Sequence, residues 1–270
     1  MPADWSDLLA CLELTPDAPA EGFAAVLEGR NQKIGYHRIF GGQLLAQFAA
    51  AAATVCPGKA VKSLHVLFPT AGRTDEPVRL EVEKHRDGGT FATLALTARQ
   101  AGGVIATAAV SMHAPEPGWD HQVMPPAASL PGPEHRADLD LLPWETRCVA
   151  DLDARESGPP ELELWMDVPE LEEGASQAVV AYATDLTLIG TALLGLEGVG
   201  QADAGRAFTS AVTSHTVWFH RPFRTGDWLL LRQEAPVAAH GRSFGRGDVL
   251  TRDGTLLASY AQEALLRLAS

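Results

Sequence analysis

The 270-residue sequence has only three cysteines, and they lie far apart. Cys11, Cys56 and Cys148 have neither the close spacing of a metal site nor the even number of a disulfide framework. We therefore expect reduced, structural thiols in a protein of the cytosol, and no metal site.

Long hydrophobic runs are also missing. The most apolar stretch, Leu44 to Cys56, is interrupted by Gln47 and is too short to span a bilayer. The start of the chain, Met1-Pro2-Ala3-Asp4, is acidic, and no apolar segment follows it, which argues against a secretory signal. We expect a soluble, cytoplasmic protein that does not bind membranes.

Positive charge is in deficit, since the formal net charge is −13. A nucleic-acid-binding protein would show a basic stripe, so this function is not expected. The overall charge does not exclude a small anionic ligand, because local arginines decide whether such a ligand binds.

Two common enzyme motifs are absent. Gly41-Gly42 precedes a predicted helix but does not form the G-x-G-x-x-G pattern of a dinucleotide site, and no G-x-S-x-G serine elbow occurs. The two glycines suit a smaller role. Backbone N–H groups at a helix N-terminus can polarise a carbonyl or hold an oxyanion.

An internal duplication is present instead. Ser63–Phe68 returns as Ser214–Phe219, and Gly103–Ala106 returns as Gly254–Ala258. A constant shift of about 150 residues indicates that one supersecondary unit was duplicated and fused. The predicted organisation is a first unit at residues 1–113, a proline-rich linker at 114–145 and a second unit at 146–270.

Each unit is predicted to be a long helix followed by antiparallel strands. The apolar segment 40–55 is the first helix, and because it is apolar on nearly every face it must be buried on nearly every face. Asp185–Leu196 is predicted to be the second. Alternating, β-branched segments separated by turn signals predict strands at 63–68, 78–85, 91–100, 104–113, 213–220, 228–234, 243–251 and 256–268.

Two polar residues of the second unit are candidates for a site. Asp185 precedes an apolar run, where an aspartate commonly does no more than cap a helix. Gln262 lies within the last predicted strand, where a buried amide must find hydrogen-bond partners. Pattern alone leaves a structural and a catalytic role equally open for Asp185.

Several stretches together resemble the type II acyl-CoA thioesterases, a bacterial and peroxisomal family with a double hotdog fold. They are Ile39-Phe40-Gly41-Gly42-Gln43, Lys62-Ser63-Leu64-His65, Arg86-Asp87-Gly88 with Phe91, Ala98-Arg99-Gln100, Tyr182-Ala183-Thr184-Asp185-Leu186, His215 with Trp218-Phe219-His220-Arg221-Pro222-Phe223, and Ala261-Gln262-Glu263. The resemblance runs from about Leu8 to Leu268 and skips the linker. It implies an α+β double hotdog in which the two sheets join edge to edge.

The resemblance also implies a reaction, the hydrolysis of acyl-CoA to a free acid and coenzyme A without a cofactor. In that family an aspartate, a glutamine and a serine or threonine hold a water molecule that attacks the thioester directly. Asp185 matches the aspartate and Gln262 the glutamine. The aspartate would act as the general base.

The third position departs from the family pattern. Counted back from His215, the family's hydroxyl residue falls on Val212, which has no hydroxyl. Either Ser214 supplies the group from one step along the strand, or a β-bulge brings Thr213 into the site. Without either, the enzyme would be weak or inactive.

Ligand contacts can be suggested for both ends of the substrate. Arg221, Arg224, Arg242 and Arg246 are candidates for the coenzyme A phosphates. Leu67, Phe68, Trp218 and Phe219 are candidates for the lining of an acyl channel. For an assembly, the resemblance implies a homo-oligomer of double hotdogs.

Two alternatives to hydrolysis stay open. Loss of the hydroxyl at Val212 fits an acyl-CoA-binding protein without activity. An enoyl-CoA hydratase would place a histidine a few residues after the aspartate, and none follows Asp185. Setting Gly42 against Gly190 places His37 opposite Asp185, and Val110 stands opposite Gln262, so the first unit is predicted to be scaffold.

Overall fold

A single antiparallel sheet dominates the computed structural model, which describes residues 3–18 and 20–269. Within these residues the sheet has twelve strands in the order β1-β2-β4-β5-β6-β3-β9-β12-β11-β10-β8-β7. The strands are β1 (Thr15–Pro16), β2 (Ala25–Gly29), β3 (Ala60–Leu67), β4 (Val78–Asp87), β5 (Phe91–Gln100), β6 (Gly103–His113), β7 (Glu145–Cys148), β8 (Glu161–Asp167), β9 (Phe208–Phe219), β10 (Trp228–Ala239), β11 (Arg242–Thr251) and β12 (Leu256–Leu268). All eight predicted strands are confirmed.

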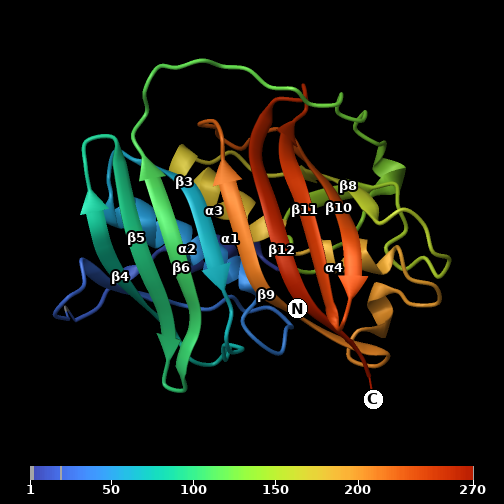
Figure 1. Cartoon of the computed structure of the whole chain (residues 1–270), viewed down its shortest axis with the longest axis horizontal. Coiled ribbons are helices and arrows are strands. Elements are labelled where there is room, and N and C mark those ends of the chain that lie inside the picture. Colours follow the sequence, from blue (N-terminus) through green and yellow to red (C-terminus); the bar gives the residue numbers. More distant parts are fainter. Residues whose placement is uncertain (1–2, 19, 270) are drawn as a thin grey trace.

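The two halves join through the central strands β3 and β9. These strands run antiparallel, with Ser63 opposite Trp218 and Leu67 opposite Ser214. The joined residues are the duplicated segments themselves, so the repeat meets its own copy at the centre of the sheet (Figure 1). This is the double hotdog architecture that the resemblance implies.

The helices lie on one face of the sheet (Figure 1). The α-helices are α1 (Trp5–Leu12), α2 (Gly41–Val55), α3 (Glu173–Thr184) and α4 (Leu188–Leu193), and two short 3-10 turns are η1 (Pro133–His135) and η2 (Gln201–Asp203). Helix α2 packs against α3, and α4 packs against β10 and β11. Nearly every residue of α2 up to Ala52 is buried, as its small, uniformly apolar side chains require.

The prediction of the second central helix was wrong in position. The long helix is α3, which ends at Thr184, and Asp185 follows it as the C-cap in a right-handed helical conformation. A short break then separates α3 from α4, which begins at Leu188. The alanine-rich segment before Asp185 therefore forms the helix that packs on α2.

The proline-rich segment crosses from the first half to the second without a helix or strand between residues 114 and 132 (Figure 1). Side chains tie it to the second half. Gln122 bonds the backbone of Gly254 and Leu256, and Arg232 donates to the carbonyls of Pro125 and Pro126.

Candidate active site

A cavity of about 440 Å³ lies where the two halves meet. The N-terminus of α2, the loop after β3, the residues after α3 and the first part of β9 all line it. Most of the lining is apolar, and Asp185 is the one carboxylic acid in it among the described residues. The site is therefore built by both halves, although the sequence assigns only the second half a chemical role.

Asp185 is almost completely buried, at 5% exposure. Burial raises the pKa of this carboxyl to about 7, and the Gly42 backbone N–H, the Gln262 amide and the charge of Arg38 oppose that rise. A carboxyl that titrates near neutrality can accept a proton from a weak acid such as water more readily than an ordinary aspartate.

Gln262 fixes one oxygen of this carboxyl. Its Nε2 donates to Asp185 Oδ1 at 2.7 Å and contacts His215 Nδ1 at 3.2 Å. The Thr184 hydroxyl donates to the Ala181 carbonyl, so it accepts from His215 Nε2, 2.9 Å away. His215 Nδ1 is therefore an acceptor, and this sets the orientation of the Gln262 amide.

Because Nε2 of Gln262 is the donor to Asp185 and His215, the other polar atom of this amide is Oε1. Gln262 Oε1 is buried and has no hydrogen-bond partner among the residues that the structure describes. His215 is wholly buried, and burial lowers its pKa to about 3, so the ring is neutral at physiological pH. It therefore forms no ion pair with Asp185, although Nδ1 and Oδ1 are 3.8 Å apart.

Strand β9 has a β-bulge next to Val212, the position at which the family's hydroxyl residue is missing. Ser214 pairs with Glu263 and Val212 with Ala264, so Thr213 is an extra residue on β9. Thr213 and Val212 line the cavity, whereas Ser214 is outside the lining. The Thr213 hydroxyl donates to the Glu263 carbonyl at 2.9 Å, so it can still accept a hydrogen bond.

The first half has a matching bulge. Val61 pairs with Met112 and Ser63 with Ser111, which leaves Lys62 as the extra residue of β3. Lys62 and Thr213 are as far apart in sequence as Ser63 and Ser214, so the bulge belongs to the duplicated unit. What differs is the residue that each copy places there.

Two glycines allow α2 to approach the carboxyl. A Cβ on Gly41 would lie 2.7 Å from Asp185 Oδ2 and 3.0 Å from Val212 Cγ1. A Cβ on Gly42 would lie 2.4 Å from the Tyr182 carbonyl oxygen, so this position also excludes a side chain. The first N–H groups of a helix have no intrahelical partners and carry a partial positive charge, which faces the carboxyl here.

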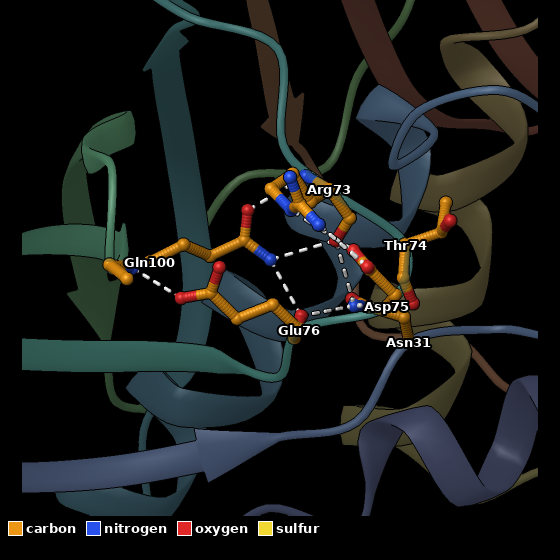
Figure 2. Close-up of polar contacts among 7 residues, drawn as sticks. Asn31, Arg73, Thr74, Asp75, Glu76 and Gln100 are labelled. Carbon is orange, nitrogen blue, oxygen red and sulfur yellow. Dashed lines mark hydrogen bonds and ion pairs between the residues drawn. The ribbon is translucent and has the colours of Figure 1, made fainter.

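The cavity wall of residues 69–72 is followed by residues 73–76, which the polar network in Figure 2 holds in place. Asn31 Nδ2 donates to the carbonyls of Arg73, Thr74 and Glu76. Gln100 accepts from the Arg73 N–H at 2.7 Å and donates to the Arg73 carbonyl at 2.8 Å. Sequence reasoning missed Asn31 and Gln100 as supports of the site.

The network is continuous with α2. Gln43, which closes the Phe40-Gly41-Gly42-Gln43 motif, donates to Asn31 Oδ1 at 2.8 Å. Its Oε1 accepts from the Gln32 N–H at 3.0 Å. The glutamine of this motif was the signal that could have pointed to Asn31, because a buried amide requires polar partners.

The four arginines suggested for coenzyme A are already engaged. Arg221 pairs with Asp120, Arg224 with Glu172, Arg242 with Glu263 and Arg246 with Glu234. None of the four lines the cavity. Sequence proximity to the site did not reveal these carboxylates, and the role of the four arginines in binding phosphate stays a prediction.

Of the four residues suggested for an acyl channel, one lies in the cavity lining. Phe68 lines the cavity. Leu67 and Trp218 are 49% and 44% exposed and lie outside the cavity lining, and Phe219 is buried elsewhere in the core. Apolar residues that the sequence did not single out, including Leu186, Ile189 and Leu193, line the cavity instead.

The first half carries no copy of the acid. The C-cap of α2 is Cys56 and the C-cap of α3 is Asp185, so Cys56, not His37, is the counterpart of Asp185. Burial raises the pKa of the Cys56 thiol. Leu64 pairs with Val110 where His215 pairs with Gln262, so the corresponding polar pair is also absent.

Two further features are absent from the described residues. No group of three His, Cys, Asp or Glu residues there could hold a metal ion. No helix in that part of the chain is both long and apolar enough to span a membrane.

Both halves of the chain are similar to known acyl-CoA thioesterases. Residues 27–113 match the family model of the acyl-CoA thioesterase N-terminal domain, and residues 107–266 match that of the C-terminal domain. Acyl-CoA thioesterase 2 of Haemophilus influenzae is 30% identical over 267 residues, which cover 90% of this chain and 92% of that protein. Mouse acyl-coenzyme A thioesterase 8 is 30% identical, with 86% of this chain and 81% of that protein covered.

Solved structures agree with these sequence matches. The acyl-CoA thioesterase II TesB2 of Mycobacterium marinum is 30% identical and has a TM-score of 0.77, with 97% of this chain and 98% of that chain covered. A hot dog fold protein of Alicyclobacillus acidocaldarius is 21% identical with a TM-score of 0.74, and 97% of this chain and 98% of that one are covered. The second likeness shows the fold alone.

Proposed function

Because this chain belongs to the acyl-CoA thioesterase family, we propose that it hydrolyses acyl-CoA thioesters by direct attack of a water molecule that Asp185 deprotonates. The observation that carries the mechanism is a buried carboxyl that faces a cavity and whose pKa is about 7. A general base is most effective when its pKa lies near the working pH.

The attacking water would be held through both of its hydrogens. Gln262 occupies Asp185 Oδ1, so Oδ2, on the Gly41 side, is the oxygen that receives the proton. The Thr213 hydroxyl already donates its own hydrogen to Glu263 and is left as an acceptor for the second one. A water held in this way keeps a lone pair for the thioester carbon.

The remaining steps use the same groups. The Gly42 N–H already contacts Asp185, so the Gly41 N–H at the start of α2 polarises the thioester carbonyl and stabilises the oxyanion that forms. When the intermediate collapses, the carbon–sulfur bond breaks and Asp185 returns its proton to the departing thiolate. One water is consumed, and the products are the carboxylic acid and the coenzyme A thiol.

A hydratase is less well supported. It needs a histidine that exchanges protons beside the aspartate, and His215 is the nearest such residue. Thr184 and Gln262 occupy its two ring nitrogens, and burial keeps its pKa near 3. His215 is therefore a positioning residue for Gln262 in this proposal.

Free-thiol release tests the proposed function directly. Purified protein is incubated with medium- and long-chain acyl-CoAs and a thiol reagent, and we expect release of coenzyme A. Binding of acyl-CoA without release would instead support the inactive binding protein. Hydration of crotonyl-CoA without thiol release would support the hydratase.

The rate should depend on pH through Asp185. The base must be ionised, and burial raises its pKa to about 7, so kcat/KM should rise with pH and level off above about 7. Below that pH it should fall about tenfold per unit. A profile measured from pH 5 to 9 that is flat, or that falls as pH rises, would contradict the assignment of the base.

Neighbouring substitutions distinguish the two candidate hydroxyls. Thr213→Val removes the hydroxyl in the cavity, and we expect kcat to fall about tenfold, the cost of one hydrogen bond of roughly 1.4 kcal/mol. Ser214→Ala, its matched control outside the cavity lining, should leave kcat within about twofold. The reverse pattern would assign the water contact to Ser214.

A further inference from the structure

We propose that Arg38 and Arg267 bind the phosphate groups of the coenzyme A moiety at the mouth of the cavity. This inference rests on the proposed function, because it concerns the non-reacting end of the same substrate. The four arginines suggested by the sequence pair with carboxylates and lie outside this cavity, whereas these two line it.

Arg38 and Arg267 differ from the other basic residues in their position in the cavity and in their lack of an ion pair. They are the cavity's only lysine or arginine residues in the described chain. Most lysines and arginines of this protein pair with a carboxylate, but within residues 3–18 and 20–269 no ion pair engages Arg38 or Arg267. Two cations that form no ion pair with a described residue therefore line the cavity of a chain whose net charge is −13.

Arg38 is half-buried, and the groups that hold its side chain in place are neutral. Its Nη2 donates to the Ser210 carbonyl at 2.9 Å and to the Tyr36 hydroxyl at 3.2 Å. The guanidinium also lies 5.6 Å from the centre of the Tyr36 ring. These neutral partners fix the side chain while leaving other N–H groups for an anion.

The register of β9 and β12 brings Arg267 to the same place. Ser210, which anchors Arg38, pairs with Leu266, and the adjacent Thr209 pairs with Arg267. The two arginines thus reach the same end of this strand pair, where Arg267 is exposed. Like charges placed near one another repel, and an anion between them removes the repulsion.

The distance of Arg267 from the reacting centre suits the far end of a long substrate, whereas Arg38, whose charge acts on Asp185, lies nearer to that centre. Arg267 follows Gln262 by five residues on β12, which at about 3.3 Å per residue places it roughly 17 Å along the strand. The pantetheine arm of coenzyme A separates the thioester sulfur from the phosphates by an extended chain of this kind. Arginine is well suited to those phosphates, since its planar guanidinium binds them through paired hydrogen bonds.

The test compares substrates with and without phosphates. KM is measured for an acyl-CoA and for the N-acetylcysteamine thioester of the same acid, in wild type, Arg38→Gln and Arg267→Gln. The assay is run at pH 9, because Arg38 also lowers the pKa of Asp185 and its loss shifts the lower limb of the pH profile. Arg252→Gln is the matched control, since Arg252 is outside the cavity lining.

We expect each cavity variant to raise KM for acyl-CoA about tenfold with little change in kcat, as for loss of a charge-assisted hydrogen bond. KM for the short thioester should not change. An equal rise for both substrates, or no rise for acyl-CoA, would overturn the proposal.

Calorimetry with coenzyme A alone separates this inference from the proposed function. Wild type and Arg252→Gln should bind coenzyme A, and the two cavity variants should bind it about tenfold more weakly. If the protein hydrolyses neither thioester, the proposed function fails, while this binding result still decides the phosphate site. Equal affinity in all four proteins would exclude it.

Discussion

The Asp185→Asn variant is expected to hydrolyse acyl-CoA about 10²–10⁴-fold more slowly than the wild type, the usual contribution of a general base. Asparagine keeps the size of the side chain but cannot accept the proton of the attacking water. The loss should appear in kcat at saturating substrate, as measured by thiol release. Activity within about threefold of wild type would remove Asp185 from the mechanism, because the base contributes far more than that.

Thermal unfolding supplies the control for this variant. In the wild type the pKa of Asp185 is raised above that of an unfolded aspartate, so the folded state holds a proton that the unfolded chain releases. The retained proton stabilises the folded state at low pH, and this stabilisation is lost as pH rises through about 7. Asparagine carries no such charge, so the variant should gain stability relative to wild type between pH 5 and pH 8.

Gln262→Met is expected to have the next largest effect. It removes the 2.7 Å hydrogen bond to Asp185 Oδ1 and the contact with His215 Nδ1, while keeping a side chain of similar length. A hydrogen bond to a charged group contributes about 1.5–3 kcal/mol, so kcat should fall roughly 10–100-fold.

The pH profile of the same variant gives a second readout. The Gln262 amide lowers the pKa of Asp185, so its loss should move the midpoint of the kcat/KM profile above about 7. A merely structural role would lower the amount of folded protein without moving this midpoint. An unchanged midpoint together with full kcat would show that Gln262 does not contact the base.

The strands could be predicted because the duplicated segments carry alternating side chains and clear turn signals, whereas the edge-to-edge joining of the two sheets was implied only by the resemblance. The position of the second helix could not. Asp185 and the apolar residues after it resemble a helix start, yet the chain keeps Asp185 as the end of α3. Packing of the small residues around Ala181 against α2 outweighs the capping preference of one aspartate.

A few residues of the candidate site could be named from the sequence, but its geometry could not be predicted. Asp185 and Gln262 were identified by resemblance, whereas the contact of Asp185 with Gly41 joins the two halves and leaves no local signal. The bulge at Thr213 was one of two open possibilities, since strand pairing depends on the partner strand as well as on the bulged one. Which carboxylate pairs with an arginine also depends on the whole fold and not on the neighbouring sequence.

The central claim is that water, and not Asp185, attacks the thioester. Rapid-quench mass spectrometry of the enzyme mixed with excess acyl-CoA tests this most directly, by following free acid, coenzyme A and the mass of the intact chain in one time course. We predict that acid and coenzyme A form at the same rate while the mass of the chain stays unchanged. A burst of coenzyme A with an acyl group attached to the peptide that contains Asp185 would contradict the account.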